Sequence, residues 1–415
     1  MKHSGIPWIG EIPKEWKSDT IGNLYTLRNE KVSDKDFPPL SVTKQGIVPQ
    51  LETAAKTDDG DNRKLVRIGD FAINSRSDRR GSCGISQYDG SVSLINTILT
   101  PRGEMNPYFY NWLFHTESFA DEFYKWGHGI VNDLWTTKWQ EMKRISIVFP
   151  PLPEQQKIAS FLDKKCSEID EMVVLQEKII EELKAYKQSV ITEAVTKGLN
   201  PDVPMKDSGI EWIGKIPESW EVCRIKNVAK LNPSFDSQID VDTNVSYMPM
   251  ECLRNGVIQN RTALYKDVLS YTPFKDNDIV MAKVTPCFEN GNIAVARNLH
   301  GGYGFGTSEI FVIRCQGDMY NQFMFYYLQS SYIKNIGVSS MTGTGGLKRV
   351  NPTTFNNAVL LHPLLSEQQE IADYLDKKCA EIDSLISIKQ SKIESLKEYK
   401  KSIIYEYVTG KKEVE

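Results

Sequence analysis

The chain carries the same stretch of sequence twice, about half its length apart. Residues 151–170 read PLPEQQKIASFLDKKCSEID, and residues 363–383 read PLLSEQQEIADYLDKKCAEID. A second pair, SGIPWIGEIPKEW at 4–16 and SGIEWIGKIPESW at 208–220, recurs in the same order. Matches of this length do not arise by chance. Because solenoid repeats have periods of roughly 20 to 50 residues, a period of about 200 indicates a duplicated pair of domains.

Each copy of the longer repeat predicts a long helix. Pro151 and Pro153 stop the preceding structure, and the carboxylate of Glu154 suits the first turn of a helix. Apolar residues then recur at three- and four-residue steps until Gly198 and Pro201 break the pattern. In the first copy they are Ile158, Leu162, Ile169, Met172, Ile179, Leu183, Tyr186 and Val190, and in the second Ile371, Leu375, Ile382, Leu385, Leu396, Tyr399 and Ile403. Helices of roughly 60 Å with such stripes are expected to pack on each other as a coiled coil.

The segments between the repeats, 17–150 and 221–362, predict mixed α/β domains. They are rich in aromatic and β-branched residues separated by Gly and Asn turns. They match each other only in outline, for example GDFAIN (69–74) with NDIVMA (277–282) and YFYNWL (108–113) with FMFYYL (323–328). Two similar helices and two dissimilar domains suggest that the helices do one job twice, while the domains do two versions of another.

Composition excludes several protein classes. The 415 residues are 40% hydrophobic and 25% charged with a net charge of −4, which predicts a globular protein and gives no overall sign of a nucleic-acid binder. No apolar run reaches the roughly 18 residues of a membrane span and the start lacks an apolar signal core, so a cytoplasmic protein with no membrane contact is expected. The seven cysteines are scattered without a C-x-x-C spacing. Neither a disulfide framework nor a metal site is therefore predicted.

Two short motifs leave an enzymatic alternative open. NPSF at 232–235 approaches the N-P-P-F motif of amino-group DNA methyltransferases, and GGYGFG at 301–306 could pass for a glycine-rich cofactor loop. A cofactor loop should follow a strand and open a helix, whereas these glycines lead into an expected strand, so turns are the favoured interpretation of both. The alternative is an autonomous DNA methyltransferase or nuclease with duplicated recognition domains.

With its paired W-I-G-x-I-P-x-x-W and E-Q-Q-x-I-A-x-x-L-D-K-K motifs, the chain resembles the specificity subunit of type I restriction-modification enzymes. The resemblance covers nearly the whole length. It implies two α/β (α+β) target-recognition domains, each reading half of a bipartite double-stranded DNA site, and two helices packed as an antiparallel coiled coil with pseudo-twofold symmetry. The helices would set the spacer and dock two methyltransferase subunits, and through them restriction and translocase subunits. No catalytic residue, cofactor or metal is implied. The expected ranges are 1–150 and 201–362 for recognition, and 151–200 and 363–415 for the helical spacers.

Candidate site residues follow from local chemistry and from the resemblance. Polar donors in turns and Gly-flanked basic loops favour DNA contacts, although pairing of the loop arginines with Asp78 is an equal alternative for that loop. The DNA candidates are Lys44, Gln45, Arg76, Arg79, Arg80, Arg254, Asn255, Lys348 and Arg349. The candidates for partner docking or helix packing are Gln155, Gln156, Leu162, Ile169, Leu183, Gln368, Gln369, Leu375, Ile382 and Leu396.

Overall fold

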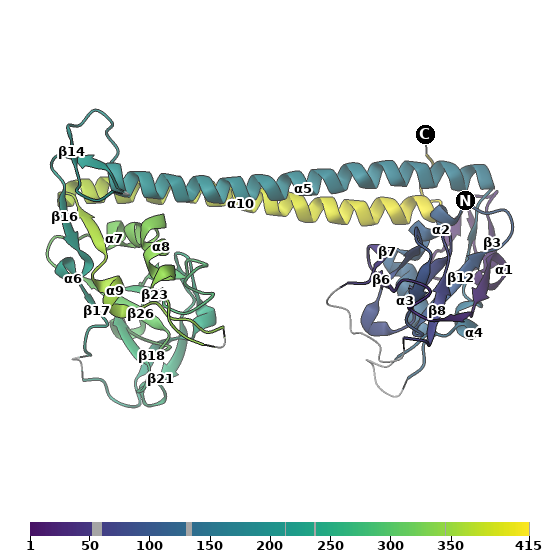
Figure 1. Cartoon of the computed structure of the whole chain (residues 1–415), viewed down its shortest axis with the longest axis horizontal. Helices are drawn as coiled ribbons and strands as arrows, with labels where there is room; N and C mark the ends of the chain where they lie inside the picture. Colours follow the sequence, from purple (N-terminus) through teal and green to yellow (C-terminus); the bar gives the residue numbers. More distant parts are fainter. Residues whose placement is uncertain (52–59, 130–134, 212, 236–237, 345, 415) are drawn as a thin grey trace. The chain divides into compact units, whose positions relative to one another are not determined.

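A computed structural model of the chain describes residues 1–51, 60–129, 135–211, 213–235, 238–344 and 346–414. The chain forms two compact units, Met1–Glu177 with Ser391–Glu415, and Lys178–Gln390 (Figure 1). Each long helix therefore belongs partly to one unit and partly to the other. These units group the residues differently from the four ranges expected from sequence, whose functional assignments stay predictions.

The first unit is built on a four-stranded antiparallel sheet with the order β10-β9-β12-β4. Its central strand, β9, is buried at every position, as its apolar sequence FAIN requires. A smaller sheet has the order β11-β8-β5, and three strand pairs complete the unit. The strands are β1 (Lys2–His3), β2 (Glu11–Ile12), β3 (Lys17–Thr20), β4 (Tyr25–Arg28), β5 (Lys31–Val32), β6 (Leu40–Thr43), β7 (Gly46–Pro49), β8 (Arg63–Val66), β9 (Phe71–Asn74), β10 (Cys83–Ile85), β11 (Gly90–Val92), β12 (Asn96–Pro101) and β13 (Ser146–Phe149). The short helices are α1 (Ile21–Leu24), α2 (Pro107–Phe114), α3 (Glu117–Lys125) and α4 (Trp139–Met142).

The second unit repeats this plan. Its main sheet has the order β17-β26-β23-β24, which is the order of the first unit read from the opposite edge. Its second sheet, β21-β18-β25-β22, is larger and contains a parallel pair, β18 with β25. The strands are β14 (Met205–Asp207), β15 (Lys215–Pro217), β16 (Glu221–Arg224), β17 (Ala229–Leu231), β18 (Asn244–Met248), β19 (Leu253–Arg254), β20 (Val257–Ile258), β21 (Arg261–Leu264), β22 (Thr272–Lys275), β23 (Ile279–Ala282), β24 (Ile293–Val295), β25 (Tyr303–Gly306), β26 (Ile310–Cys315) and β27 (Val359–His362). The short helices are α6 (Ile225–Val228), α7 (Asn321–Leu328), α8 (Ser331–Ser339) and α9 (Pro352–Asn356).

The aromatic helices α2 and α7 occupy equivalent places in the two units. Their residues correspond one position away from the alignment of 108–113 with 323–328 that was predicted from sequence. The indole of Trp112 donates to Asp163 Oδ1 (2.8 Å), and the hydroxyl of Tyr326 donates to Asp376 Oδ1 (2.6 Å). Trp112 is therefore equivalent to Tyr326, whereas the sequence alignment paired it with Tyr327. The error arose because both segments are aromatic throughout, so residue type alone does not fix the register. Half of the residues of α2 and all but one of α7 are buried, as expected for core.

The two long helices, α5 (Leu152–Lys197) and α10 (Leu365–Val408), confirm the predicted helical repeats. In the first unit the start of α5 packs on the end of α10, where the rings of Phe161 and Tyr407 lie 4.5 Å apart (Figure 1). In the second unit the end of α5 meets the start of α10, where Lys187 Nζ lies 2.7 Å from Asp383 Oδ2. Within each unit the helices therefore run antiparallel, which confirms the fold class.

The contact seam of these helices differs from the apolar stripe expected from sequence. Seam positions alternate in steps of four and three, the spacing of a coiled coil. They are Leu162, Cys166, Ile169, Val173, Gln176, Ile180, Leu183, Lys187 and Val190 in α5, and Leu375, Cys379, Ile382, Ile386, Lys389, Ile393, Leu396, Lys400 and Ile403 in α10, all buried or half-buried. Met172, Tyr186, Leu385 and Tyr399 of the expected stripe are 39% to 51% exposed. Beside Tyr186 and Tyr399 the seam residue is a lysine, Lys187 or Lys400, so the adjacent apolar residue was chosen in its place. Beside Met172 and Leu385 the seam residue is itself apolar, Val173 or Ile386, and the periodicity did not separate the two neighbours.

The shorter sequence repeat covers the end of a long helix in each unit. Gly198 and Gly410, which follow α5 and α10, have φ values of 76° and 70° and so end the helices in the left-handed region. The rings of Trp220 and Trp16, the last residues of the two motifs, lie against these glycines and are fully buried. The two repeats therefore recur together because each short motif encloses the end of a long helix. Of the helices described, none has the length and apolar character needed to cross a membrane.

Candidate functional site

Beyond the ends of the central strands, the first unit has a set of backbone hydrogen bonds that joins three segments. The Ser75 amide donates to the carbonyl of Ile95 (3.3 Å), and the Thr137 amide donates to the carbonyl of Ser75 (3.0 Å). The Ser77 amide donates to the carbonyl of Trp135 (3.0 Å). We call this arrangement the loop frame. It holds the segment after β9 between the residue before β12 and the residues before α4.

The second unit has the same loop frame at equivalent positions. The Lys283 amide donates to the carbonyl of Glu309 (3.0 Å), and the Val350 amide donates to the carbonyl of Lys283 (2.8 Å). The Thr285 amide donates to the carbonyl of Lys348 (3.0 Å). The backbone pattern is thus repeated bond for bond after β23, before β26 and before α9.

The side chains on the two loop frames differ in chemistry. Ile95, which is 40% exposed, occupies the place of Glu309. Trp135, whose indole donates to the carbonyl of Tyr124 (2.8 Å), occupies the place of Lys348. One backbone frame therefore presents an aliphatic and aromatic surface in the first unit and a charged surface in the second.

In the second unit Glu309 and Arg349 form a bidentate ion pair. Arg349 Nε and Nη2 lie 2.8 Å from the two carboxylate oxygens of Glu309. This hydrogen bonding lowers the pKa of Glu309, with a smaller contribution from the charge of Lys283, so the pair is intact at neutral pH and is lost only as the pH falls through that lowered pKa. The neighbouring Lys348 is exposed, and its ammonium group has no ion-pair partner among the residues described. Of the two predicted basic residues here, one is thus engaged within the protein and the other faces solvent.

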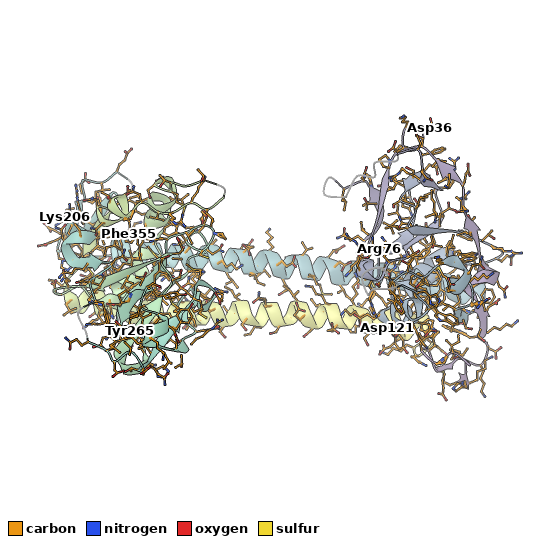
Figure 2. The ribbon with its side chains drawn as sticks, turned by 90° about the horizontal axis from the view of Figure 1, so that it is seen from below. Asp36, Arg76, Asp121, Lys206, Tyr265 and Phe355 are labelled. Carbon is orange, nitrogen blue, oxygen red and sulfur yellow. The ribbon has the colours of Figure 1, made fainter. Side chains whose placement is uncertain are left out.

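The arginines of the first unit, Arg76, Arg79 and Arg80, lie beside its loop frame, and each of them lies near a carboxylate. Arg76 and Arg79 approach the carboxylate of Asp78, at 3.5 and 3.7 Å. Arg80 forms an ion pair with Asp121 of α3. Figure 2 labels Arg76 and Asp121 on the same flank of the first unit. The structure thus contains the pairing considered as the alternative to DNA contact, and the role of these arginines in DNA binding stays a prediction.

The four other DNA candidates lie in two equivalent hairpin turns. Hairpin β6–β7 packs on β10, and hairpin β19–β20 packs on β24. The close approach to β10 requires Gly84, because a Cβ there would lie 2.7 Å from the Cα of Gly46. The turn residues are not equivalent one to one, since Lys44 and Gln45 form the first tip whereas Arg254 ends its strand and pairs with Val257. Lys44, Gln45, Arg254 and Asn255 are all exposed.

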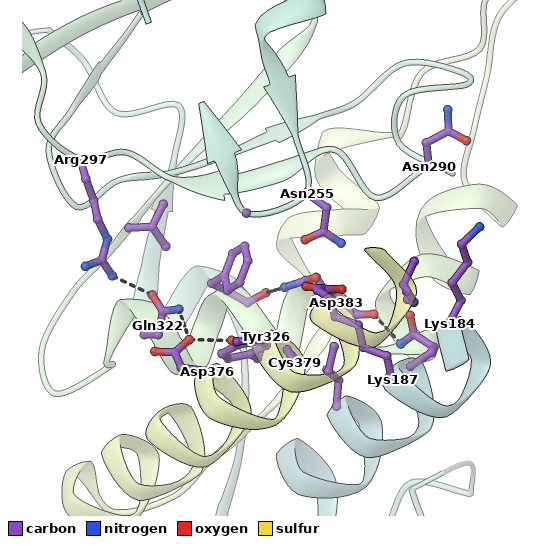
Figure 3. Close-up of a pocket in the computed structure, with 18 residues that line it drawn as sticks. Lys184, Lys187, Asn255, Asn290, Arg297, Gln322, Tyr326, Asp376, Cys379 and Asp383 are labelled. Atoms are coloured by element: carbon purple, nitrogen blue, oxygen red, sulfur yellow. Dashed lines mark hydrogen bonds and ion pairs between the residues drawn. The ribbon is translucent and has the colours of Figure 1, made fainter. Parts of the chain in front are cut away.

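A hollow of about 850 Å³ in the second unit lies beside this turn (Figure 3). Asn255 and Arg297 face side chains of the long helices across it. Arg297 donates to Gln322 (2.9 Å), which donates in turn to Asp376 (2.8 Å). Burial raises the pKa of the Tyr326 phenol, and its hydrogen bond to Asp376 raises the pKa further, so it stays a donor at neutral pH. Arg297, Gln322, Asp376 and Tyr326 thus form one connected set of hydrogen bonds on the wall of this hollow.

The predicted docking residues fall into two classes. Gln155 and Gln368 are fully buried, and each accepts a hydrogen bond at 2.8 Å from a backbone amide near the start of α2 or α7. Their neighbours Gln156 and Gln369 are exposed. The apolar candidates lie in the seam, where Leu162, Ile169, Leu375 and Ile382 are buried and Leu183 and Leu396 are half-buried. These positions serve helix packing, while any role in partner docking stays a prediction.

Sequence reasoning missed a repeated pair of exposed apolar positions on the long helices. Met172 and Leu175 of α5 are 39% and 54% exposed, and Leu385 and Ile388 of α10 are 46% and 59% exposed. They occupy the same places in the two sequence repeats. Comparing the repeats at positions outside the seam could have identified them, because a solvated helix face normally carries polar residues at both copies.

The features considered for other chemistries have structural roles. Cys166 and Cys379 are buried in the seam, and burial raises the pKa of both thiols to about 11. In GGYGFG a short turn leads into strand β25, and the Asn232 side chain of NPSF accepts a hydrogen bond from the Val312 amide (2.9 Å). Within the described ranges, no group of three or more His, Cys, Asp or Glu side chains is placed to hold a metal ion.

Comparison with known proteins identifies relatives of one kind. Residues 13–185 and 217–409 match the family described as "Type I restriction modification DNA specificity domain". The type I restriction enzyme EcoEI and EcoAI specificity subunits of Escherichia coli are 29% and 30% identical over 205 and 201 residues, and the matched part is about a third of each relative (34% and 33%). The MjaVIII specificity subunit of Methanocaldococcus jannaschii is 29% identical over 96% of this chain and 93% of its own length.

Two solved structures share the fold. One is a chain from a structure of complex assembly and conformational transition in a type I R-M system, with a TM-score of 0.74 and 14% identity over 96% of this chain and 98% of that one. The other is the HsdS subunit from Thermoanaerobacter tengcongensis, with a TM-score of 0.56 and 15% identity over 96% and 98% of the two chains. Neither the family match nor these folds favours the autonomous methyltransferase or nuclease.

Proposed function

This chain belongs to the family of type I restriction-modification DNA specificity domains, and we propose that it is the non-catalytic subunit that selects the DNA target of a methyltransferase complex. Each unit reads one half of a bipartite double-stranded site. The long helices set the spacer between the halves and bind two methyltransferase subunits, through which restriction and translocase subunits join. The chain itself needs no cofactor.

The observation that carries this proposal is a repeated backbone with divergent surface chemistry. The loop frames match bond for bond, yet Ile95 and Trp135 stand where Glu309 and Lys348 stand in the other unit. A catalytic duplication would keep its reactive groups alike in both copies. A pair of modules that read different sequences keeps the scaffold and varies the side chains, because base edges are distinguished by the donors, acceptors and apolar groups that meet them.

The repeated apolar positions on α5 and α10 support two like partners. Met172 with Leu175 and Leu385 with Ile388 are separated from their own seam and exposed. A helix of a partner could bury either pair, in the manner of an amphipathic helix that docks its apolar face. The exposed Gln156 and Gln369 offer further polar contacts at equivalent places.

The decisive experiment is reconstitution with the methyltransferase subunit, followed by native mass measurement. We expect one chain with two partners, and methylation at a bipartite sequence only when this chain is present. The variants Met172→Glu/Leu175→Glu and Leu385→Glu/Ile388→Glu should each lose one partner, and their combination should lose both. The control Lys206→Glu adds a carboxylate at an exposed strand residue outside these positions and should leave the 1:2 complex intact.

Two results would contradict the proposal. A single partner per wild-type chain would remove the argument from the repeated helix positions. Saturable binding of S-adenosylmethionine by the purified chain, with methylation in the absence of a partner, would make the chain an enzyme in its own right.

A further inference from the structure

The ion pair of Glu309 and Arg349 lies in the loop frame of the second unit and joins two of its three segments. Glu309 precedes β26, and its carbonyl accepts from the Lys283 amide (3.0 Å). Arg349 belongs to the segment 346–349 that precedes α9. The bidentate contact therefore ties this segment to the main sheet through side chains, in addition to the backbone bonds of the frame.

The segment 346–349 is fixed at several further atoms. Thr285 Oγ1 donates to the carbonyl of Gly346 (2.9 Å) and accepts from the amide of Lys348 (3.0 Å). The Arg349 amide donates to the carbonyl of Thr342 (2.9 Å), and the Thr342 amide donates to the carbonyl of Arg349 (3.0 Å). The Leu347 amide donates to the carbonyl of Thr344 (3.3 Å), so every residue of the segment makes at least one backbone hydrogen bond. Leu347 is 55% exposed beside the exposed Lys348.

Fixation of this kind is unusual for a segment that only fills the surface. Holding the backbone of this segment in place costs conformational entropy, and the exposed ion pair that helps to hold it returns little of that cost in stability. A fixed backbone with an unpaired, solvent-facing ammonium group is suited to meet a negative charge from outside the chain. A lysine binds a phosphate as a compact point charge.

On the basis of the proposed function, we infer that the loop frame is the DNA-facing edge of the second unit, where Lys348 contacts a backbone phosphate beside the second half-site. Glu309 and Arg349 are positioning residues for that contact. Arg349, although predicted from sequence as a DNA ligand, acts on Lys348 through the segment and not on the DNA directly.

The equivalent positions of the first unit agree with this division of roles. There the frame is kept by the same backbone bonds, while Ile95 and Thr136 replace the ion pair and Trp135 replaces Lys348. The pair is therefore not required for the frame to form. The ion pair occurs in the second unit, which is the unit that presents a lysine, Lys348, on its loop frame.

The test uses the complex with methyltransferase subunits and a DNA duplex that carries its mapped target. Lys348→Ala should weaken binding about fivefold at ~0.15 M salt and reduce the slope of log K against log salt by about 0.9, as expected for one lost phosphate contact. The control Lys206→Ala, at an exposed lysine of the same unit (Figure 2), should leave both quantities unchanged.

Two double variants keep the net charge and separate positioning from direct contact. Glu309→Gln/Arg349→Gln removes the ion pair and should weaken DNA binding. In a chain that already carries Lys348→Ala, the same double substitution should weaken DNA binding little further. Glu309→Arg/Arg349→Glu reverses the pair and should restore binding to within about twofold of wild type. Unchanged folding of each variant is checked by its 1:2 assembly with the methyltransferase.

The outcomes distinguish the possibilities. If Lys348→Ala changes neither affinity nor slope, the inference is wrong. If the reversed pair binds as weakly as the removed pair, Arg349 contacts DNA itself and the positioning role is overturned. If the wild-type complex shows no sequence preference at all, the proposed function fails independently of any variant.

Discussion

At the scale of single residues, adjacent identical side chains have different roles in this chain. Gln155 and Gln156 are indistinguishable by residue type, yet the first is fully buried and the second exposed. Sequence could identify the E-Q-Q motif as repeated, but not which glutamine turns inward, because that depends on where α2 lies. The amide of Gln155 joins α5 to the start of α2 and to Pro150, with both bonds at 2.8 Å.

We predict that Gln155→Ala destabilises the first unit by about 1 to 3 kcal/mol, since the Asn106 amide and the Pro150 carbonyl lose their partner in a buried place. Gln156→Ala, one residue further on, should change stability by less than about 0.5 kcal/mol. Hydrogen exchange over α5 and α2 measures both. Equal effects of the two substitutions would show that the buried amide bridge does not stabilise the unit. Gln368→Ala and Gln369→Ala repeat the comparison in the second unit.

At the scale of elements, the long helices show which patterns sequence can resolve. Their existence and the end of α5 at Gly198 follow from periodicity and end signals. The residues of the seam could not be predicted in the same way. Four seam positions are polar, and a search for apolar residues at helical spacing passes over them. These positions are Gln176, Lys187, Lys389 and Lys400. Buried polar residues in a coiled coil specify its register at some cost in stability. Two of the seam lysines meet an aspartate of the other helix, Lys187 with Asp383 and Lys400 with Asp170, and these two pairs occupy equivalent places in the repeats.

The two pairs should have equal coupling energies. In double-mutant cycles, Lys187→Met with Asp383→Asn should give about 0.2 to 1 kcal/mol, because both partners are partly solvated. Lys400→Met with Asp170→Asn should give the same value in the first unit. Hydrogen exchange of the helix amides at low and high salt reports the coupling and its screening. As a control, Lys187→Met with Glu381→Gln should show none. A coupling found in one unit alone would argue against equivalent helix contacts.

At the scale of the whole molecule, the duplication could be predicted from sequence and the loop frames could not. The repeats predicted two α/β units and an antiparallel helix pair. The loop frames were invisible because they are backbone patterns whose side chains differ, so Ser75 and Lys283 share a place without sharing a residue type. Some predicted basic residues lie near these frames, Arg80 in the first unit and Arg349 in the second, but only the structure shows that carboxylates engage them.

Exchange of the globular part of one unit should alter one half-site only. Replacing residues 17–150 by the same segment of a relative with a different target should change the first half-site and leave the second, because each unit has its own core and loop frame. Methylation mapping of the chimaera measures this. The reciprocal exchange of 221–362 is the matched control. A chimaera altered in both half-sites would mean that the units read DNA jointly.

The last prediction concerns the spacer, which the long helices set in the proposed function. One heptad inserted after Glu177 and one after Gln390 would keep the seam in phase and lengthen each helix by about 10 Å, or about three base pairs. Three base pairs also rotate the duplex by roughly 100°, so the second half-site would present a different face and methylation should be weak. Three heptads in each helix add about 32 Å, close to the ~34 Å of one DNA turn, and restore both length and rotation. That variant should methylate the same two half-sites with a spacer longer by about nine or ten base pairs. A four-residue insertion at the same points, which breaks the seam phase, is the control and should destabilise the helix pair. If the three-heptad variant keeps the original spacer, or changes a half-site, the helices do not set the spacing.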